Sequence, residues 1–337
     1  MHYPFIIFNS EGSGQPATRY ICGFSGSDST LIIMQDRLYL LVDGRYWEQA
    51  ENEIQNSKTI TSPKVEVVKI HRNYLQKRAL LDIFKKHSLK SLHLDSRITS
   101  YAIVQALEKY KVNVVGCDGV LQHMREIKSA DEMVLIEKSQ RIALTAFEKF
   151  KREVVCGVTE RALAAKLEYV MKCEGADGPS FETIVASGPH SALPHATVTD
   201  RKIEASDAVI VDFGARVDGY CSDFTRTILM PKASPKLKKI YSIVQRAQTA
   251  ALKCAIVGTP LKSIDGAARQ VIEKAGYGMY FTHSTGHGVG MEVHELPYVS
   301  YRSTSKLQIG HVITVEPGVY IPGLGGVRLE EMVVAHN

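Results

Sequence analysis

VIVDFGARVDGYCSDFT (residues 209–225) contains two β-rich runs separated by Val217-Asp218-Gly219, which is typical of a tight turn between antiparallel strands. If Val217 and Asp218 form the turn, Asp212 lies directly opposite Asp223. If Asp218 and Gly219 form it, Asp212 lies one diagonal away. Because side chains alternate along a strand, both registers place the two carboxylates on the same face of the sheet.

Two carboxylates on one face repel each other unless one is protonated or a cation lies between them. The pair can also be interpreted as exposed turn residues. However, Asp212 follows the apolar run Ala208–Val211, which is typical of a buried strand. Because burying an unpaired carboxylate is unfavourable, we favour a bound metal ion at this pair.

The C-terminal segment repeats this arrangement. The mostly apolar run Val312–Val315 leads into Glu316, and Pro317-Gly318 ends the strand. After a connection rich in glycine and proline, a strand is predicted over Val327–Val334. Arg328 and Glu330 share one face of this strand. Glu331 points to the other face and is interpreted as a solvent-facing or structural acid.

Between the two acidic pairs lies FTHSTGHGVGMEVH (residues 281–294), which contains His283, His287 and His294. A single histidine is usually a core residue, but three beside four carboxylates favour a functional site. The interleaved glycines let the backbone approach a crowded site closely. They do not indicate a phosphate-binding loop, because no helix pattern follows them.

Four carboxylates and one histidine form an oxygen-rich ligand set, which favours Mn²⁺, Co²⁺, Fe²⁺ or Zn²⁺ over a thiolate zinc site. Two shared carboxylates would hold two ions about 3.5–4 Å apart, the spacing of hydrolytic two-metal sites. A water between the ions would have its pKa lowered toward ~7. The remaining histidines would then polarise a carbonyl group and transfer protons.

Composition indicates a globular chain with two domains. The chain has 337 residues, 45% of them hydrophobic and 23% charged, and a formal charge of +5 without a basic cluster, which argues against a nucleic-acid partner. The sequence shows neither a signal peptide nor an apolar run of the ~20 residues that a membrane span needs. The six cysteines are scattered without a CxxC pair, so free thiols and a cytoplasmic location are expected.

The N-terminal part alternates strand and helix patterns, which predicts a smaller α/β domain over residues 1–122 and a second domain over residues 123–337. Strands and one helix are predicted at these positions: strands Pro4–Phe8, Ser29–Met34, Leu38–Val42 and Val112–Val115, and helix Ile98–Tyr110. The second domain opens with a helix that has a capping box from Ser129 to Glu132.

The second domain contains a repeat. A helix starting near Thr159 ends at Gly175, and another starting near Pro260 ends at Gly276. Each follows a long helix, the second of which is capped by Ser234, and each precedes strands that carry the carboxylates. The pattern predicts an α+β domain of two similar halves.

These segments together resemble the pita-bread metallopeptidases, the family of creatinase, aminopeptidase P and prolidase. The resemblance rests on the order Asp, Asp, His, Glu, Glu and on residues 184–195, IVASGPHSALPH. The stretches Gly23–Ser27 and Asp43–Tyr46 resemble the creatinase-type N-terminal domain. The resemblance therefore implies a pita-bread catalytic domain preceded by that smaller domain.

The resemblance also implies roles for individual residues. Asp212 would bind one ion, Asp223 and Glu330 would bridge both, and His287 and Glu316 would complete the other. Glu316 would also handle the proton of the nucleophile. The side chains implied around the substrate are three histidines and one arginine: His283 and His294 as catalytic groups, with His195 and Arg328 binding substrate. Arg328 can also be interpreted as neutralising the acidic cluster, and His190 as an ordinary loop residue.

The implied activity is hydrolysis of the Xaa-Pro bond, in dipeptides or at the N-terminus of longer peptides. The implied cofactor is a pair of divalent ions, with Mn²⁺ favoured over Co²⁺, Zn²⁺ or Fe²⁺. The implied assembly is a homodimer. One alternative is a methionine aminopeptidase-like hydrolase, although those enzymes usually lack the N-terminal domain. Another is a non-catalytic pita-bread protein that binds peptides, although such relatives have typically lost metal ligands.

Overall fold

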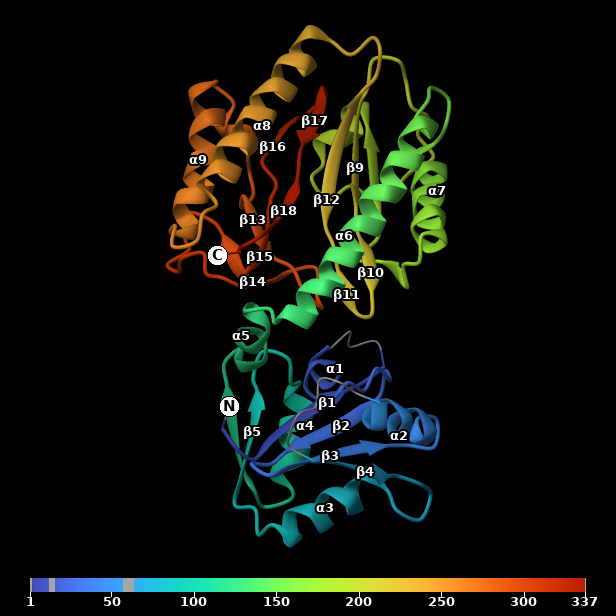
Figure 1. The fold of residues 1–337 in the computed structure, drawn as a ribbon, viewed down its shortest axis with the longest axis vertical. Coiled ribbons are helices and arrows are strands. Elements are labelled where there is room, and N and C mark those ends of the chain that lie inside the picture. The colour runs from blue at the N-terminus through green and yellow to red at the C-terminus, as the bar shows by residue number, and fades with distance from the viewer. Residues whose placement is uncertain (1, 12–15, 57–63, 337) are drawn as a thin grey trace. The chain divides into compact units, whose positions relative to one another are not determined.

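The computed structural model describes residues 2–11, 16–56 and 64–336. It divides into two compact units, Met1–Met124 and Arg125–Asn337 (Figure 1). The division falls in α5 (Val120–Glu126), close to the boundary predicted between residues 122 and 123. Within the described ranges, no helix combines the length and the apolar character needed to cross a membrane.

The first unit is built around a six-stranded sheet in the order β4-β3-β2-β1-β5-β6. β1, β2 and β3 pair antiparallel, whereas β4, β5 and β6 join as parallel strands. Successive residues of its central strands enter two different hydrophobic cores, so both faces of the sheet are covered. The strands are β1 (Phe5–Asn9), β2 (Ser29–Ile33), β3 (Arg37–Val42), β4 (Lys64–Lys69), β5 (Ser91–Asp95) and β6 (Asn113–Cys117).

Helices connect the strands of this sheet. They are α1 (Ala17–Cys22), α2 (Trp47–Asn56), α3 (Gln76–Lys86) and α4 (Tyr101–Glu108). The four predicted strands are confirmed as β1, β2, β3 and β6. The predicted helix over residues 98–110 is confirmed but shorter, because Ser100 has an extended backbone and α4 begins only after it.

The second unit contains two pairs of packed helices, as the repeat predicts. The first pair is α6 (Ala130–Phe150) and α7 (Glu160–Cys173), and the second is α8 (Pro235–Cys254) and α9 (Leu261–Lys274). The predicted caps are confirmed: Ser129 and Glu132 form a capping box, and the Ser234 hydroxyl accepts a hydrogen bond from the Leu237 N–H. Gly175 and Gly276, which follow α7 and α9, both have positive φ.

Strands lie between the two helix pairs (Figure 1). The first half contains β7 (Gly178–Pro179), β8 (Ile184–Ser187), β9 (Ala208–Phe213), β10 (Ala215–Val217), β11 (Tyr220–Cys221) and β12 (Phe224–Leu229). The second contains β13 (Gly286–Gly288), β14 (Glu295–Val299), β15 (Val312–Val315), β16 (Gly318–Ile321), β17 (Gly325–Arg328) and β18 (Glu331–Val334). Short 3-10 turns occur at Lys151–Glu153, Gly188–Ala192 and Gly278–Tyr280. The predicted α+β architecture of two similar halves is confirmed.

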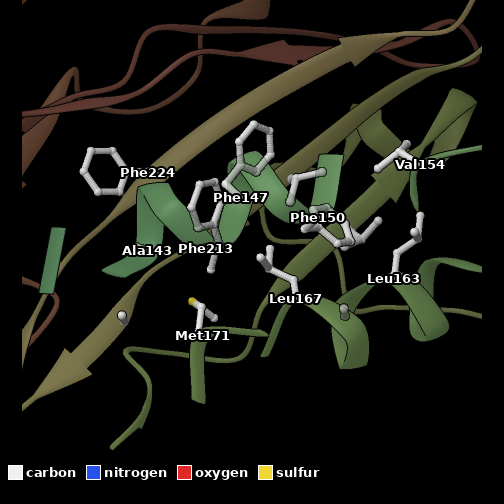
Figure 2. Close-up of a cluster of buried hydrophobic side chains, with 14 of the residues drawn as sticks. Ala143, Phe147, Phe150, Val154, Leu163, Leu167, Met171, Phe213 and Phe224 are labelled. Carbon is white, nitrogen blue, oxygen red and sulfur yellow. The ribbon is translucent and has the colours of Figure 1, made fainter. Parts of the chain in front are cut away.

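The hydrophobic core of the first half, part of which Figure 2 shows, packs α6 and α7 against β9 and β12. Phe213 of β9 stacks on Phe147 of α6, with ring centroids 4.9 Å apart and planes 8° from parallel. Phe213 is completely buried in this core. Because neighbouring side chains of a strand point to opposite faces, packing Phe213 against the helices turns Asp212 toward the other face.

The structure decides between the two registers left open by the sequence. Val217 pairs with Tyr220, so the turn consists of Asp218 and Gly219, both with positive φ (48° and 83°). The same register continues into β9 and β12, where Asp212 pairs with Thr225. The second register is therefore confirmed, with Asp223 one diagonal away from Asp212 and on the same face.

The prediction of one continuous strand over Val327–Val334 is wrong. The ladder is interrupted between β17, which pairs with β16, and β18, which pairs with β15. The backbone N–H of Glu330 instead donates to the carbonyl of Thr225, 3.1 Å away in the other half. The segment predicted as a mere connection also contains β16. Glu316 and Glu330 thus both lie where this long hairpin is interrupted.

Candidate metal centre and active site

The structure brings every sequence-predicted site residue to one cavity of about 920 Å³. The predicted metal ligands in its lining come from both halves: Asp212, Asp223, His287, Glu316 and Glu330. The predicted substrate and catalytic side chains line the same cavity: His195, His283, His294 and Arg328. Residues separated by more than one hundred positions therefore surround one space.

The ligand atoms are close enough to share a cation. Asp223, His287 and Glu330 each offer one atom, and these atoms lie within 4.8 Å of one another. His287 Nε2 lies 3.6 Å from Asp223 Oδ2 and 3.4 Å from Glu316 Oε1. Asp223, His287 and Glu330 are buried, so water screens their charges poorly.

The four acids of this cluster have one buried counter-charge, Arg328, which pairs with Asp212. Burial, with Glu330 and Asp212 nearby, raises the pKa of Asp223 well above its usual value. Burial, with Glu316 and Asp212 nearby, likewise raises the pKa of Glu330. For Glu316, burial raises the pKa to about 8 despite the nearby Arg328. Burial lowers the pKa of His287 to about 4, which keeps the ring neutral and able to bind a metal.

The donor set fits divalent metal ions. Asp212 Oδ1 is buried and has no hydrogen-bond partner among the described residues. Leaving such an oxygen without a partner typically costs about 1–3 kcal/mol, more when it is charged. A divalent cation between Asp212 and the neighbouring carboxylates would satisfy this oxygen and remove the repulsion that raises their pKa values.

Arg328 makes contacts that fit both of its predicted roles. Its Nη2 donates to Asp212 Oδ2 at 2.6 Å, which is the neutralising contact. Its Nη1 donates to Tyr320 Oη at 2.8 Å and to the Pro194 carbonyl at 3.1 Å, next to His195. The guanidinium group is buried and lies in the cavity wall between the acids and the segment carrying His195.

The two predicted catalytic histidines occupy different surroundings. His283 Nδ1 lies 2.8 Å from the Ser284 carbonyl and must donate to it, so Nε2, 2.9 Å from Tyr320 Oη, accepts from the phenol. Burial lowers the pKa of His283 to about 4. The His294 ring lies 4.2 Å from the His287 ring, centroid to centroid. Loss of surrounding water, with His195 nearby, lowers the pKa of His294, which favours a neutral ring.

His195 and His190 lie in different environments. His195 follows the 3-10 turn Gly188–Ala192, is exposed, and lines the cavity. His190 lies within that turn, and its Nδ1 is 2.9 Å from a carboxylate oxygen of buried Glu160. It is absent from the described cavity lining. Its contacts are those of a structural residue.

Sequence reasoning missed Tyr320, which links His283 to Arg328. Burial raises the pKa of Tyr320 to about 12, so its hydroxyl keeps its proton and donates to His283. The alternation of β16 would have placed Tyr320 on the face of Arg328, because Gly318 pairs with Arg328. That signal was lost when the segment was interpreted as a connection.

Comparison with known proteins agrees with this geometry. Residues 134–337 match the model of metallopeptidase family M24, and residues 5–127 match that of the creatinase/prolidase N-terminal domain. The chain belongs to metallopeptidase family M24. It is accordingly a metal-dependent hydrolase, and the predicted resemblance and enzyme class are confirmed.

Relatives in this family cover most of the chain. A Xaa-Pro dipeptidase of Pyrococcus horikoshii is 44% identical over 265 residues, covering 77% of this chain and 75% of that protein. An uncharacterized peptidase of Bacillus subtilis is 38% identical over 318 residues, covering 94% of this chain and 87% of that protein.

Solved structures of an X-Pro aminopeptidase and a prolidase confirm the predicted pita-bread fold. The X-Pro aminopeptidase of Thermotoga maritima superimposes with a TM-score of 0.88 at 37% identity, covering 99% of this chain and 92% of that one. The prolidase of Pyrococcus furiosus gives a TM-score of 0.86 at 37% identity, covering 99% and 94%.

Proposed function

We propose that this M24 peptidase cleaves the bond between an N-terminal residue and a following proline, using two divalent ions, with Mn²⁺ favoured over Co²⁺, Zn²⁺ or Fe²⁺. The observation that carries the proposal is the gathering of five metal-binding side chains and three further histidines around one cavity. The names of the Pyrococcus dipeptidase and the Thermotoga aminopeptidase support the Xaa-Pro specificity.

The five ligands divide by position. Asp223 and Glu330, which belong to different halves, would be shared by both ions, Asp212 would hold one ion, and His287 with Glu316 would hold the other. Bound divalent ions supply Lewis acidity and a water whose pKa is lowered toward ~7. Glu316 Oε2 lies 3.9 Å from His283 Nδ1. In our proposal Glu316 takes the proton of the attacking water and delivers it to the proline nitrogen, which must be protonated to leave.

The other side chains orient the substrate. His294 donates a hydrogen bond to the oxygen of the scissile carbonyl as negative charge develops on it. His283, whose ring Tyr320 orients, binds the peptide beside Glu316. His195 and Arg328 form the wall against the proline residue.

The activity is tested with three peptide series on the Mn²⁺-loaded protein: Xaa-Pro, Xaa-Pro-Yaa and Met-Xaa. We expect the protein to hydrolyse at least one of the two proline series. We also expect kcat/KM for Met-Xaa to be at least ~100-fold lower, a difference of about 2.7 kcal/mol in transition-state binding. Preferential cleavage of Met-Xaa would support the methionine aminopeptidase alternative. If the metal-loaded protein cleaves none of the three series, the alternative of a non-catalytic peptide-binding protein is supported.

The bridging role predicts different metal contents for three variants. Asp223→Asn and Glu330→Gln are each expected to lose roughly half or more of the bound metal, because a shared carboxylate serves both ions. His283→Ala is expected to keep both ions, since its ring bonds to Ser284 and Tyr320. Metal analysis after dialysis checks this. Full metal content in both carboxylate variants would refute the ligand assignment.

Arg328→Ala is expected to raise KM for Xaa-Pro substrates roughly tenfold, more than it lowers kcat, because one charge-assisted contact is worth about 1.5–3 kcal/mol. Arg328→Lys is the matched control, since it keeps the charge beside Asp212 but loses the planar fork. Steady-state kinetics and metal analysis are measured together. If Arg328 only neutralises the acids, Arg328→Ala will lose metal with KM unchanged, and the lysine will restore the metal.

We also propose a homodimer, on the family resemblance alone. Analytical ultracentrifugation is expected to give twice the chain mass of 37.3 kDa. A fully active monomer at assay concentration would contradict the proposal.

A further inference from the structure

A second cluster of charged side chains is buried beside the cavity without lining it. Arg125 Nε donates to Glu295 Oε1 at 2.9 Å, and Lys128 Nζ lies 3.3 Å from Glu295 Oε2. The exposed fractions of these side chains are 2%, 0% and 0%. None of the three belongs to the described cavity lining or to the proposed ligand set.

This cluster holds the segment that carries His294. Arg125 Nη2 donates to Glu292 while its Nε bonds to Glu295. The backbone N–H of Glu292 also donates to Glu295 Oε1 at 3.1 Å. One guanidinium group therefore ties together the residues on both sides of His294.

The same segment is packed too closely to shift freely. A Cβ added to Gly290 would lie 2.3 Å from Glu295 Oε2 and 3.0 Å from Lys128 Cε, so the backbone rests directly on the ion pair. The Gly290 carbonyl accepts from the Cys221 N–H at 2.8 Å. Cys221 lies two residues before the ligand Asp223, so the cluster connects the His294 segment to the metal-site hairpin.

Stability alone is a weak explanation for such a cluster. Desolvating buried charges costs about as much as their attraction returns, and apolar side chains of similar volume often stabilise a fold equally well. The desolvation is evident here, because burial lowers the pKa of Lys128 in spite of its carboxylate partner. What apolar side chains would not reproduce is the directional fork that Arg125 makes to Glu292 and Glu295.

We propose that Arg125, together with Glu295 and Lys128, is a positioning group for His294. The fork from Arg125 fixes the backbone of residues 292–295, and this backbone sets where the His294 ring donates its hydrogen bond. The inference rests on the proposed function, in which that donor stabilises the transition state. It assigns a role to three charged residues that contact neither the ions nor the peptide.

Arg125→Met in the full-length Mn²⁺-loaded protein is expected to lower kcat about 10- to 100-fold, the usual effect of losing an outer-shell contact or misplacing a catalytic group. KM and metal content are expected to stay within about twofold, since binding residues and ligands are untouched. In a His294→Ala background, Arg125→Met is expected to lower kcat no further, because the residue it positions is already gone.

Arg201→Met is the matched control. Arg201 forms an ion pair with buried Asp207 at 2.6 Å, and its guanidinium group also donates to Ser187 and to the Lys202 carbonyl, all in the other half of the domain from residues 289–295. In the double variant Arg201→Met/His294→Ala, the fold-decreases in kcat that the two single substitutions cause are expected to multiply. If the effects of Arg125→Met and His294→Ala also multiply, Arg125 has only a structural role and the inference is overturned.

Hydrogen exchange gives a readout that does not depend on activity. In Arg125→Met the amides of residues 290–295 are expected to exchange at least ~10-fold faster, as their anchoring bonds are lost. If the wild type cleaves no Xaa-Pro peptide, the proposed function fails. The exchange measurement still tests whether Arg125 holds the segment that carries His294. Unchanged exchange would overturn the inference. Should Arg125→Met not fold, the variant Arg125→Met/Lys128→Met/Glu295→Leu removes the three fully buried charges of this cluster and carries the same expectations.

Discussion

Removing divalent ions is expected to lower hydrolysis of Xaa-Pro peptides by about 10³-fold or more, and added Mn²⁺ is expected to restore it. Asp212, Asp223, Glu316 and Glu330 surround one space, and burial raises the pKa of three of them. Without cations, these groups must either repel one another or take up protons. In neither condition do they hold a water of lowered pKa against the scissile carbonyl group.

The measurement pairs activity with thermal unfolding after chelation and dialysis. Because ions bind the folded chain, Mn²⁺ at ~1,000 times its dissociation constant should stabilise the fold by about 4 kcal/mol. The control is the double variant Asp223→Asn/Glu330→Gln, whose Tm should not respond to Mn²⁺. Full activity in thoroughly demetallated protein would exclude the proposed mechanism.

Local sequence signals sufficed for the helices and for the first acidic pair. The caps at Ser129 and Ser234 lie within a few residues of the helices that they start, so their chemistry is visible in a short window. The hairpin carrying Asp212 and Asp223 was also visible, but its register was not. The observed turn has positive φ at both Asp218 and Gly219, a conformation that Asp-Gly adopts readily and that a β-branched residue such as Val217 disfavours, so turn chemistry was the signal that could have chosen the register.

Contacts between distant residues explain what the sequence did not reveal. The interruption at Glu330 arises because its N–H bonds to Thr225, more than one hundred residues away, instead of to the neighbouring strand. The cluster around Glu295 has the same origin, since Arg125 lies 170 residues earlier in the chain. No periodicity or local motif marks such partners, whereas Asp212 and Glu316 were visible because each follows a mostly apolar run.

His294→Ala is expected to lower kcat about 10²- to 10³-fold while both ions remain bound. His294 lines the cavity beside the ligand His287 but is outside the proposed ligand set. The lowered pKa of His294 favours a neutral ring, which donates through a single N–H. A donor aimed at the developing oxyanion acts mainly in the transition state, so its loss lowers kcat and leaves KM nearly unchanged.

His190→Ala is the matched control for this experiment. His190 also belongs to a segment bordering the site, but its ring is bonded to buried Glu160 and does not line the cavity. Its loss is expected to lower Tm by a few degrees, as removal of one partner of a buried charged group does, with kcat within about threefold. Steady-state kinetics, metal analysis and thermal unfolding on both variants separate the two roles. If His294→Ala loses metal, His294 is a metal ligand. If its kcat stays within about threefold of wild type, His294 is not the donor to the oxyanion.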